Sequence, residues 1–220
     1  MESHNHSVDC PIESTRRRLP CPWLALCLAI AACATPIKEP EPSGFLTDYS
    51  SLQAVSENHL QALNPALAHY HQFVIERPIV LYKPDEGGDE FSADELDELK
   101  DHIVGQFASR LGKDEVYQVV DEPGPDIARL RFVITDLDAT DGLLNISFIT
   151  KATGAGLGGI AMEMEASDSI SGEQLLGAVR WGTGSRVLRA GITRLGDAKI
   201  QTSRWARDFR QLLDELAEKG

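Results

Sequence analysis

Hydrophobic and polar residues alternate in several stretches in the second half of the chain. In residues 127–135, Arg129 and Arg131 would face one way and the intervening apolar residues the other, which is the two-residue period of a strand with one buried face. Residues 160–166 alternate methionine with glutamate at their centre, and residues 175–181 follow a Ser-Gly pair. Because such a pair favours a tight turn, these last two stretches predict a β-hairpin.

Two earlier stretches also predict strands. Residues 73–82 and residues 116–120 are rich in β-branched and aromatic side chains, which favour extended backbone. The longer stretch contains Pro78, which has no N–H to donate to a sheet. We therefore expect Pro78 to mark a sheet edge or a bulge.

Two segments have the 3.6-residue period of amphipathic helices. The first begins at a capping box formed by Ser92 and Glu95, with Phe91 placed to pack on the first turn, and ends at Gly112. The second is expected to be capped by Asp197. The first helix would bury Leu96, Leu99, Ile103, Phe107 and Leu111; the second would bury Trp205, Phe209, Leu212, Leu213 and Leu216, with Arg204, Arg207 and Arg210 toward its other side.

The order of these elements predicts an α+β fold. A mostly antiparallel sheet with the two main amphipathic helices packed on one face would bury both apolar stripes. The sequence contains no internal repeat. We therefore expect a single domain, over residues 44–220, to hold all of these elements.

The N-terminal segment predicts a secretion signal. Three arginines, residues 16–18, precede an uncharged apolar stretch over residues 23–32, which is too short to span a bilayer and is typical of a signal peptide. All four cysteines of the chain lie in its first 33 residues. A disulfide framework for the folded domain is therefore not expected, and the alternatives for the segment are an unprocessed hydrophobic tail or a buried helix.

The end of the apolar stretch, Ile-Ala-Ala-Cys33, resembles the bacterial lipobox. The resemblance implies cleavage between Ala32 and Cys33, a diacylglyceryl thioether on the Cys33 sulfur and an acyl chain on its new amino group. Two or more chains would anchor the protein firmly. Since Ala34 rather than an aspartate follows the cysteine, the resemblance also implies a place in the outer membrane, facing the periplasm.

The chain is thus expected to have three parts. Residues 1–32 would be the lipoprotein signal peptide, and residues 33–43 the lipidated cysteine with a proline-rich tether, whose composition favours extended backbone. Residues 44–220 would be the α+β domain.

A Gly-Phe-Leu-Thr-Asp-Tyr-Ser segment opens the chain after the tether, at residues 44–50. Further distinctive segments are residues 124–136, 158–169 and 171–175 and the Trp205-Ala206 pair in the last helix. In this order the segments resemble the DUF3313 family of bacterial lipoproteins, and the opening at residues 44–50 is the most specific of them. The family is uncharacterised, so the resemblance implies location and architecture and assigns no catalytic residue.

The net charge of −13 argues against a nucleic-acid partner, which would need a basic surface. Residues 34–126 carry 6 basic and 19 acidic residues, whereas residues 127–220 carry 12 of each. The acidic residues 85–101 would form a solvated face around the first helix, which is the preferred interpretation, or dock a basic partner. The arginines of residues 186–210 could contact those acids, a partner or anionic cell-surface glycans, and pairing within the chain is preferred for them.

The acidic turn at residues 136–142 is the candidate metal site. Asp136, Asp138 and Asp141 precede a glycine, and hard cations such as Ca²⁺ bind clustered carboxylates. The spacing departs from the EF-hand pattern, and a solvated acidic turn is the preferred interpretation.

Two other patterns suggest chemistry only weakly. A zinc site would require His69, His71, His102 and Asp101 to converge. The preferred interpretation is that these histidines lie on the surface. The glycines of residues 154–159 lack the helix that a dinucleotide loop must precede.

These observations predict a membrane-anchored lipoprotein that serves the cell envelope as a non-enzymatic interaction or accessory module, with no cofactor. Its partners would be membrane lipid, through acylated Cys33, and an envelope protein. The alternatives are a periplasmic hydrolase using the acids of residues 136–141, or a small-ligand or metal-binding module.

Overall fold

The computed structural model describes residues 40–81, 91–139, 159–183 and 193–219. Its central element is an eight-stranded sheet in the order β1-β2-β8-β7-β6-β3-β5, with β4 also paired to β6. The strands are β1 (Gln53–Ser56), β2 (His59–Leu63), β3 (Gln72–Ile75), β4 (Ile79–Val80), β5 (Gln118–Val120), β6 (Ile127–Asp138), β7 (Gly159–Asp168) and β8 (Gln174–Thr183).

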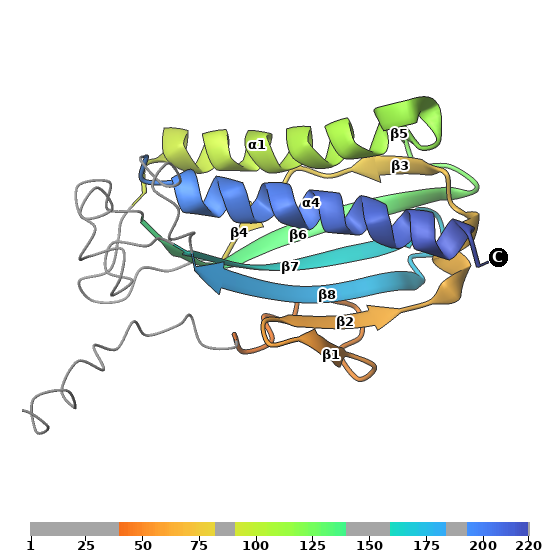
Figure 1. The fold of residues 1–220 in the computed structure, drawn as a ribbon, viewed down its shortest axis with the longest axis horizontal. Coiled ribbons are helices and arrows are strands. Elements are labelled where there is room, and N and C mark those ends of the chain that lie inside the picture. The colour runs from red at the N-terminus through yellow and green to blue at the C-terminus, as the bar shows by residue number, and fades with distance from the viewer. Residues whose placement is uncertain (1–39, 82–90, 140–158, 184–192, 220) are drawn as a thin grey trace, which may run out of the picture. The chain divides into compact units, whose positions relative to one another are not determined.

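The predicted α+β class and helix placement are confirmed. Strands β1, β2, β8, β7 and β6 pair antiparallel, while β3, β4 and β5 run parallel to their neighbours, so the sheet is mixed. Helices α1 (Ala93–Leu111) and α4 (Gly196–Ala217) lie side by side over one face of the sheet (Figure 1). Two short 3-10 helices complete the described elements, η1 (Pro65–His69) and η2 (Lys113–Glu115).

Helix α1 begins and ends where its sequence predicts. The Ser92 side chain accepts from the Glu95 N–H, and the Glu95 carboxylate accepts from the Ser92 N–H, so two N–H groups without partners in the helix are satisfied. Gly112 is the C-cap residue. The face that packs on the sheet carries the predicted residues, of which Leu99, Ile103, Phe107 and Leu111 are buried.

Helix α4 has the predicted apolar face but not the predicted start. Its N-cap residue is Leu195, and Asp197 lies inside the first turn, fully buried, so the prediction that Asp197 caps the helix is wrong. The helix starts earlier because a turn that closes with a 2.8 Å hydrogen bond from Gly196 N–H to the Thr193 carbonyl precedes it.

The arginines of α4 do not all face outward as expected. Arg204 and Arg207 are exposed. The side chain of Arg210 is only 14% exposed, because its guanidinium lies over the Tyr117 ring and donates to the Lys113 carbonyl at 2.9 Å. Arg210 therefore joins α4 to the end of α1.

The strand predicted over residues 73–82 is two strands, β3 and β4, both parallel to β6. The break falls at Glu76–Pro78, where Glu76 N–H still donates to the Leu130 carbonyl at 2.9 Å. Pro78 has no N–H to extend this pairing, so the ladder resumes only at β4. No helix in the described part of the chain is long and apolar enough to cross a membrane.

Candidate functional site

Strand β7 carries two buried carboxylates on the face of the sheet opposite to the helices. Met162 and Met164 pack in the core beneath α1 and α4, and the alternation of a strand turns Glu163 and Glu165 the other way. Their exposures are 0% and 1%. Since a buried carboxylate is very unfavourable without donors, the chain must supply partners on this second face.

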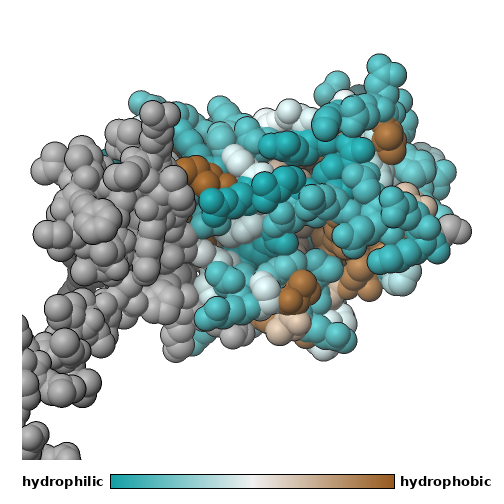
Figure 2. All heavy atoms as spheres, in the orientation of Figure 1, coloured by the Kyte–Doolittle hydropathy of each residue, from teal (hydrophilic) through white to brown (hydrophobic). Residues whose placement is uncertain are grey.

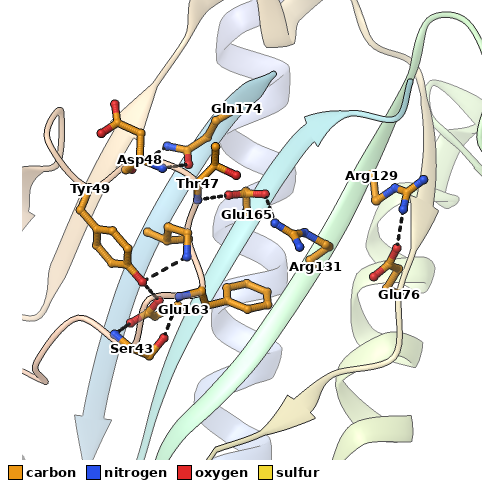
Figure 3. A network of polar contacts seen from close by, with 12 residues as sticks. Ser43, Thr47, Asp48, Tyr49, Glu76, Arg129, Arg131, Glu163, Glu165 and Gln174 are labelled. Carbon is orange, nitrogen blue, oxygen red and sulfur yellow. Dashed lines mark hydrogen bonds and ion pairs between the residues drawn. The ribbon is translucent and has the colours of Figure 1, made fainter. Parts of the chain in front are cut away.

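The partners of Glu163 come from the segment directly after the proline-rich stretch. Ser43 N–H donates to one oxygen of Glu163 at 2.9 Å, and the Tyr49 hydroxyl donates to the other at 2.5 Å (Figure 3). The same hydroxyl accepts from Leu46 N–H at 3.1 Å. Tyr49 therefore links the backbone of its own segment to strand β7.

Glu165 is held from two sides. Thr47 N–H donates to one of its oxygens at 2.6 Å, and the guanidinium of Arg131, on β6, donates to the other. The Arg131 guanidinium also lies over the Phe45 ring, 5.0 Å from its centroid. Each of the four oxygens of Glu163 and Glu165 thus accepts a hydrogen bond.

Apolar and backbone contacts complete the docking of residues 43–52, here called the covering segment. Asp48 and Gln174 exchange two hydrogen bonds of 2.9 Å between backbone and side-chain amide. A second, small apolar cluster lies under the segment. Its buried members are Leu46, Ala161, Val179 and Trp181, with Phe45, Tyr49, Leu52 and Leu60 packed against them.

Two glycines permit this close approach. Gly44 has a φ of +82°, in the left-handed region that favours glycine. Gly177, on β8, lies beneath Leu46, and a Cβ atom there would stand 2.8 Å from the Gln174 amide nitrogen. A larger residue at Gly177 would therefore displace the side chain that holds Asp48.

The protonation of Tyr49 is consistent with a permanent attachment of the covering segment to the sheet. Burial, and then the hydrogen bond to Glu163, raise the pKa of Tyr49. Its hydroxyl therefore stays protonated and donating at neutral pH. Because all four carboxylate oxygens are engaged, the arrangement fixes a backbone segment to the sheet.

The acidic candidates Asp136 and Asp138 lie at the end of β6. Asp136 accepts from Leu137 N–H at 2.8 Å, and Asp138 is exposed. Asp141 lies outside the described residues. Within the part of the chain that is described, no group of three metal-binding side chains comes together.

The histidine candidates are dispersed in the structure. His102 contacts the Lys199 carbonyl and the Ser203 hydroxyl of α4, both at 3.0 Å, and Asp101 pairs with Arg77. His71 lies against the Tyr117 ring. His69 is exposed.

Of the arginines expected to pair with the acidic start of α1, Arg194 does so. Asp97, Glu98 and Asp101 remain half or more exposed, as expected for a solvated face. Glu95 contacts Arg194 at 3.0 Å, and Glu98 contacts Lys199 at 2.5 Å. Residues 82–90, 184–192 and most of the glycine run at 154–159 lie outside the described residues.

Sequence reasoning missed the pairing between the covering segment and β7. The alternation around Glu163 and Glu165 was visible, but polar residues on one side of a strand normally face solvent. The signal that could have revealed the pairing was the unexplained run of residues 44–50, which combines aromatic with hydroxyl side chains outside any predicted element.

A family model described as "Protein of unknown function (DUF3313)" matches residues 41–209, which include the whole covering segment. No curated protein matches the chain. Among solved structures, a leucine-to-methionine variant of the PelC dodecamer from Paraburkholderia phytofirmans is 13% identical, and the PelC dodecamer without this substitution is 12% identical. Both have a TM-score of 0.45, with 70% of this chain and 95% of that chain covered. Protein XCC0632 from Xanthomonas campestris, of the DUF330 family, is 12% identical, with a TM-score of 0.36 over 71% of this chain and 88% of that one.

Proposed function

We propose that this chain, which belongs to the DUF3313 family, is a lipid-anchored protein of the bacterial cell envelope whose folded domain acts as an interaction or accessory module. The observation that carries the proposal is the docking of residues 43–52. This segment directly follows the proline-rich stretch after Cys33. Its backbone is hydrogen bonded to two buried carboxylates of β7.

The distance from the membrane follows from the sequence before the covering segment. Residues 34–42 contain three prolines, and proline-rich chain extends by about 3.1 Å per residue. A lipidated Cys33 would therefore hold Ser43 within roughly 30 Å of the bilayer surface. This length would limit how far the start of the domain stands from the bilayer.

The covering segment would fix the end of such a tether firmly to the sheet. Tension on the tether would act on Ser43, whose N–H is bonded to Glu163 on an internal strand of the sheet. Three further hydrogen bonds to the sheet, from Thr47, Asp48 and Tyr49, would resist the same tension. A terminal segment without such contacts would fray.

The use of the carboxylates favours a binding role over catalysis. A catalytic carboxylate must be within reach of substrate, whereas Glu163 and Glu165 are covered and engaged on both oxygens. The polar network therefore supports attachment of the domain.

Expression of a Cys33→Ser variant in a Gram-negative host tests the anchor. The native protein should sediment with membranes and carry an acyl adduct at Cys33 by mass spectrometry, whereas the variant should be released to the soluble fraction without the adduct. Cys27→Ser is the matched control, because it removes a thiol from the same segment and should leave the adduct unchanged. Membrane association of Cys33→Ser equal to that of the native protein would defeat the proposal.

The proposed outer-membrane location has its own test. An Ala34→Asp variant places an aspartate after the lipidated cysteine and should move the protein from outer to inner membrane fractions on a density gradient. An Ala34→Ser variant should stay with the native protein. Identical distribution of all three proteins would contradict sorting by this position.

A further inference from the structure

Two adjoining hollows lie between α4 and the part of the sheet formed by β2, β7 and β8. The inner one is mostly apolar, with a volume of about 30 Å³, and is lined among others by Met162, Leu176 and Phe209. The outer one, of about 220 Å³, is lined among others by Arg204 and Arg207. Both are lined by His59, Arg180, Trp205 and Asp208. These four residues therefore form the boundary between an apolar and a polar space.

The ring of His59 is oriented by its neighbour across the sheet. His59 on β2 stands opposite Arg180 on β8, and the Arg180 guanidinium donates to His59 Nδ1 at 3.1 Å. The same guanidinium donates to Asp208 of α4 at 2.9 Å. Because Nδ1 accepts, the neutral ring carries its proton on Nε2.

That Nε2–H is a buried donor with no acceptor. His59 is 8% exposed, and its Nε2 has no hydrogen-bond partner among the described residues. Burial and the positive charge of Arg180 lower the pKa of His59 to about 4. The ring is therefore neutral at physiological pH and presents one donor, which is unfavourable until an acceptor meets it.

The outer hollow is positively charged although the whole chain carries −13. Three arginines, Arg180, Arg204 and Arg207, line it together with one acidic residue, Asp208. Asp208 is already bonded to Arg180, and lies 3.5 Å from Arg207. The described contacts of Arg204 include no ion pair. An anion entering this hollow would thus meet an excess of positive charge.

We propose that the two hollows form a binding site for a small amphipathic anion. A carboxylate or phosphate oxygen accepts from His59 Nε2–H beside Arg204 and Arg207, and a short apolar end packs against Met162 and Leu176.

The dimensions set the size of the ligand. An inner space of about 30 Å³ holds roughly two water-sized groups, so only a short chain end enters it. The anionic head occupies the larger outer hollow. Figure 2 shows the helix-bearing face as mainly hydrophilic, with apolar atoms in small separate groups. The apolar end therefore gains burial in the inner hollow rather than on a broad apolar surface.

Calorimetric titration of the full-length chain with hexanoate, hexyl phosphate and hexanol tests the site. At least one of the two anions should bind saturably, and hexanol about 10-fold more weakly or not at all, because it lacks the charge that the arginines recognise. Comparison of the two anions separates carboxylate from phosphate recognition. In proton–nitrogen NMR spectra, the His59 Nε2–H signal should shift on binding.

Variants locate the binding. Arg204→Gln and Arg207→Gln are surface changes that leave the core intact, and each should weaken anion binding by about 3- to 10-fold. Lys219→Gln is the matched control, since it removes one positive charge beyond the end of α4 and should change nothing. The proposal is overturned if neither anion binds, if hexanol binds equally well, or if both arginine variants bind like the control. The proposed anion site does not depend on the lipid anchor, so the two proposals are tested independently.

Discussion

The hydroxyl of Tyr49 donates to a carboxylate oxygen of Glu163 at 2.5 Å, although 114 residues separate the two in sequence. This bond joins the covering segment to an internal strand of the sheet. Glu163 is fully buried, so the bond lies where water cannot replace it. Loss of either partner leaves a buried polar group without its hydrogen bond.

Tyr49→Phe should lower the free energy of unfolding by about 1 to 3 kcal/mol, because it strips a donor from a buried carboxylate oxygen and an acceptor from Leu46 N–H. Denaturant unfolding followed by fluorescence or circular dichroism measures it. Tyr70→Phe is the control: its hydroxyl donates to Asp168, whose carboxylate also accepts from Ser171. The account would be contradicted if Tyr49→Phe lowered the free energy of unfolding no more than Tyr70→Phe does.

Arg131→Met should destabilise the protein by about 2 to 4 kcal/mol, because it leaves the Glu165 charge buried without a cation. Because the Arg131 side chain is one-third exposed, the loss of stability should lie toward the lower end of this range. Adding Glu165→Gln should restore about 1 kcal/mol or more, since the amide oxygen still accepts from Thr47 N–H without a charge.

The control for that pair is Arg129→Met on the same strand. Arg129 pairs with the half-exposed Glu76, so its loss should amount to about 1 kcal/mol or less. If Arg129→Met and Arg131→Met destabilise the protein equally, the burial of Glu165 does not determine how much stability is lost with its arginine.

Acidification should destabilise the fold through His59. Its pKa is about 4 in the folded protein against an ordinary 6.5, because of burial and Arg180, so the unfolded chain takes up the proton first. Stability is therefore complete above pH 6.5 and falls as the pH drops toward 4, at about 1.4 kcal/mol per unit when fully expressed. Burial lowers the pKa of His102 too, in the same direction.

Unfolding curves of the native protein and a His59→Gln variant between pH 7 and pH 4 measure this contribution. The variant keeps an acceptor for Arg180 but cannot titrate, so its stability should depend less steeply on pH. Parallel curves would show that His59 is not the group responsible.

Ser92→Ala should destabilise the protein by about 1 kcal/mol, because it removes the oxygen that accepts from Glu95 N–H at the start of α1. Ser109→Ala, at an exposed position inside the same helix, should change stability little or raise it slightly, since alanine has the higher helix propensity. A loss at Ser109 as large as at Ser92 would argue against the capping box.

The elements that could be predicted from the sequence are those with local signals. The capping box at Ser92, the apolar faces of both helices and the hairpin of β7 with β8 all follow from periodicity and turn chemistry within a few residues. The parallel pairing of β3 with β5 and β6 could not be predicted, because register between distant strands leaves no local pattern.

The docking of the covering segment could not be predicted from the sequence for a related reason. Glu163 and Glu165 have the alternation of a solvent-facing strand side, and only the fold brings Ser43, Thr47 and Tyr49 across it. Likewise Asp197 has the residue type of a cap, but a preceding turn starts the helix before it. In each case a long-range contact or a neighbouring turn overrode the local preference.

The central claim, that the covering segment is a firm end for the tether, rests on two backbone N–H groups donating to buried carboxylates. Amide hydrogen exchange at Ser43 and Thr47, read by NMR or by mass spectrometry of short peptides, tests it most directly. We expect both amides to exchange as slowly as those of β7, because release requires opening of the sheet face. Exchange at both positions as fast as in the proline-rich stretch before them would contradict the claim.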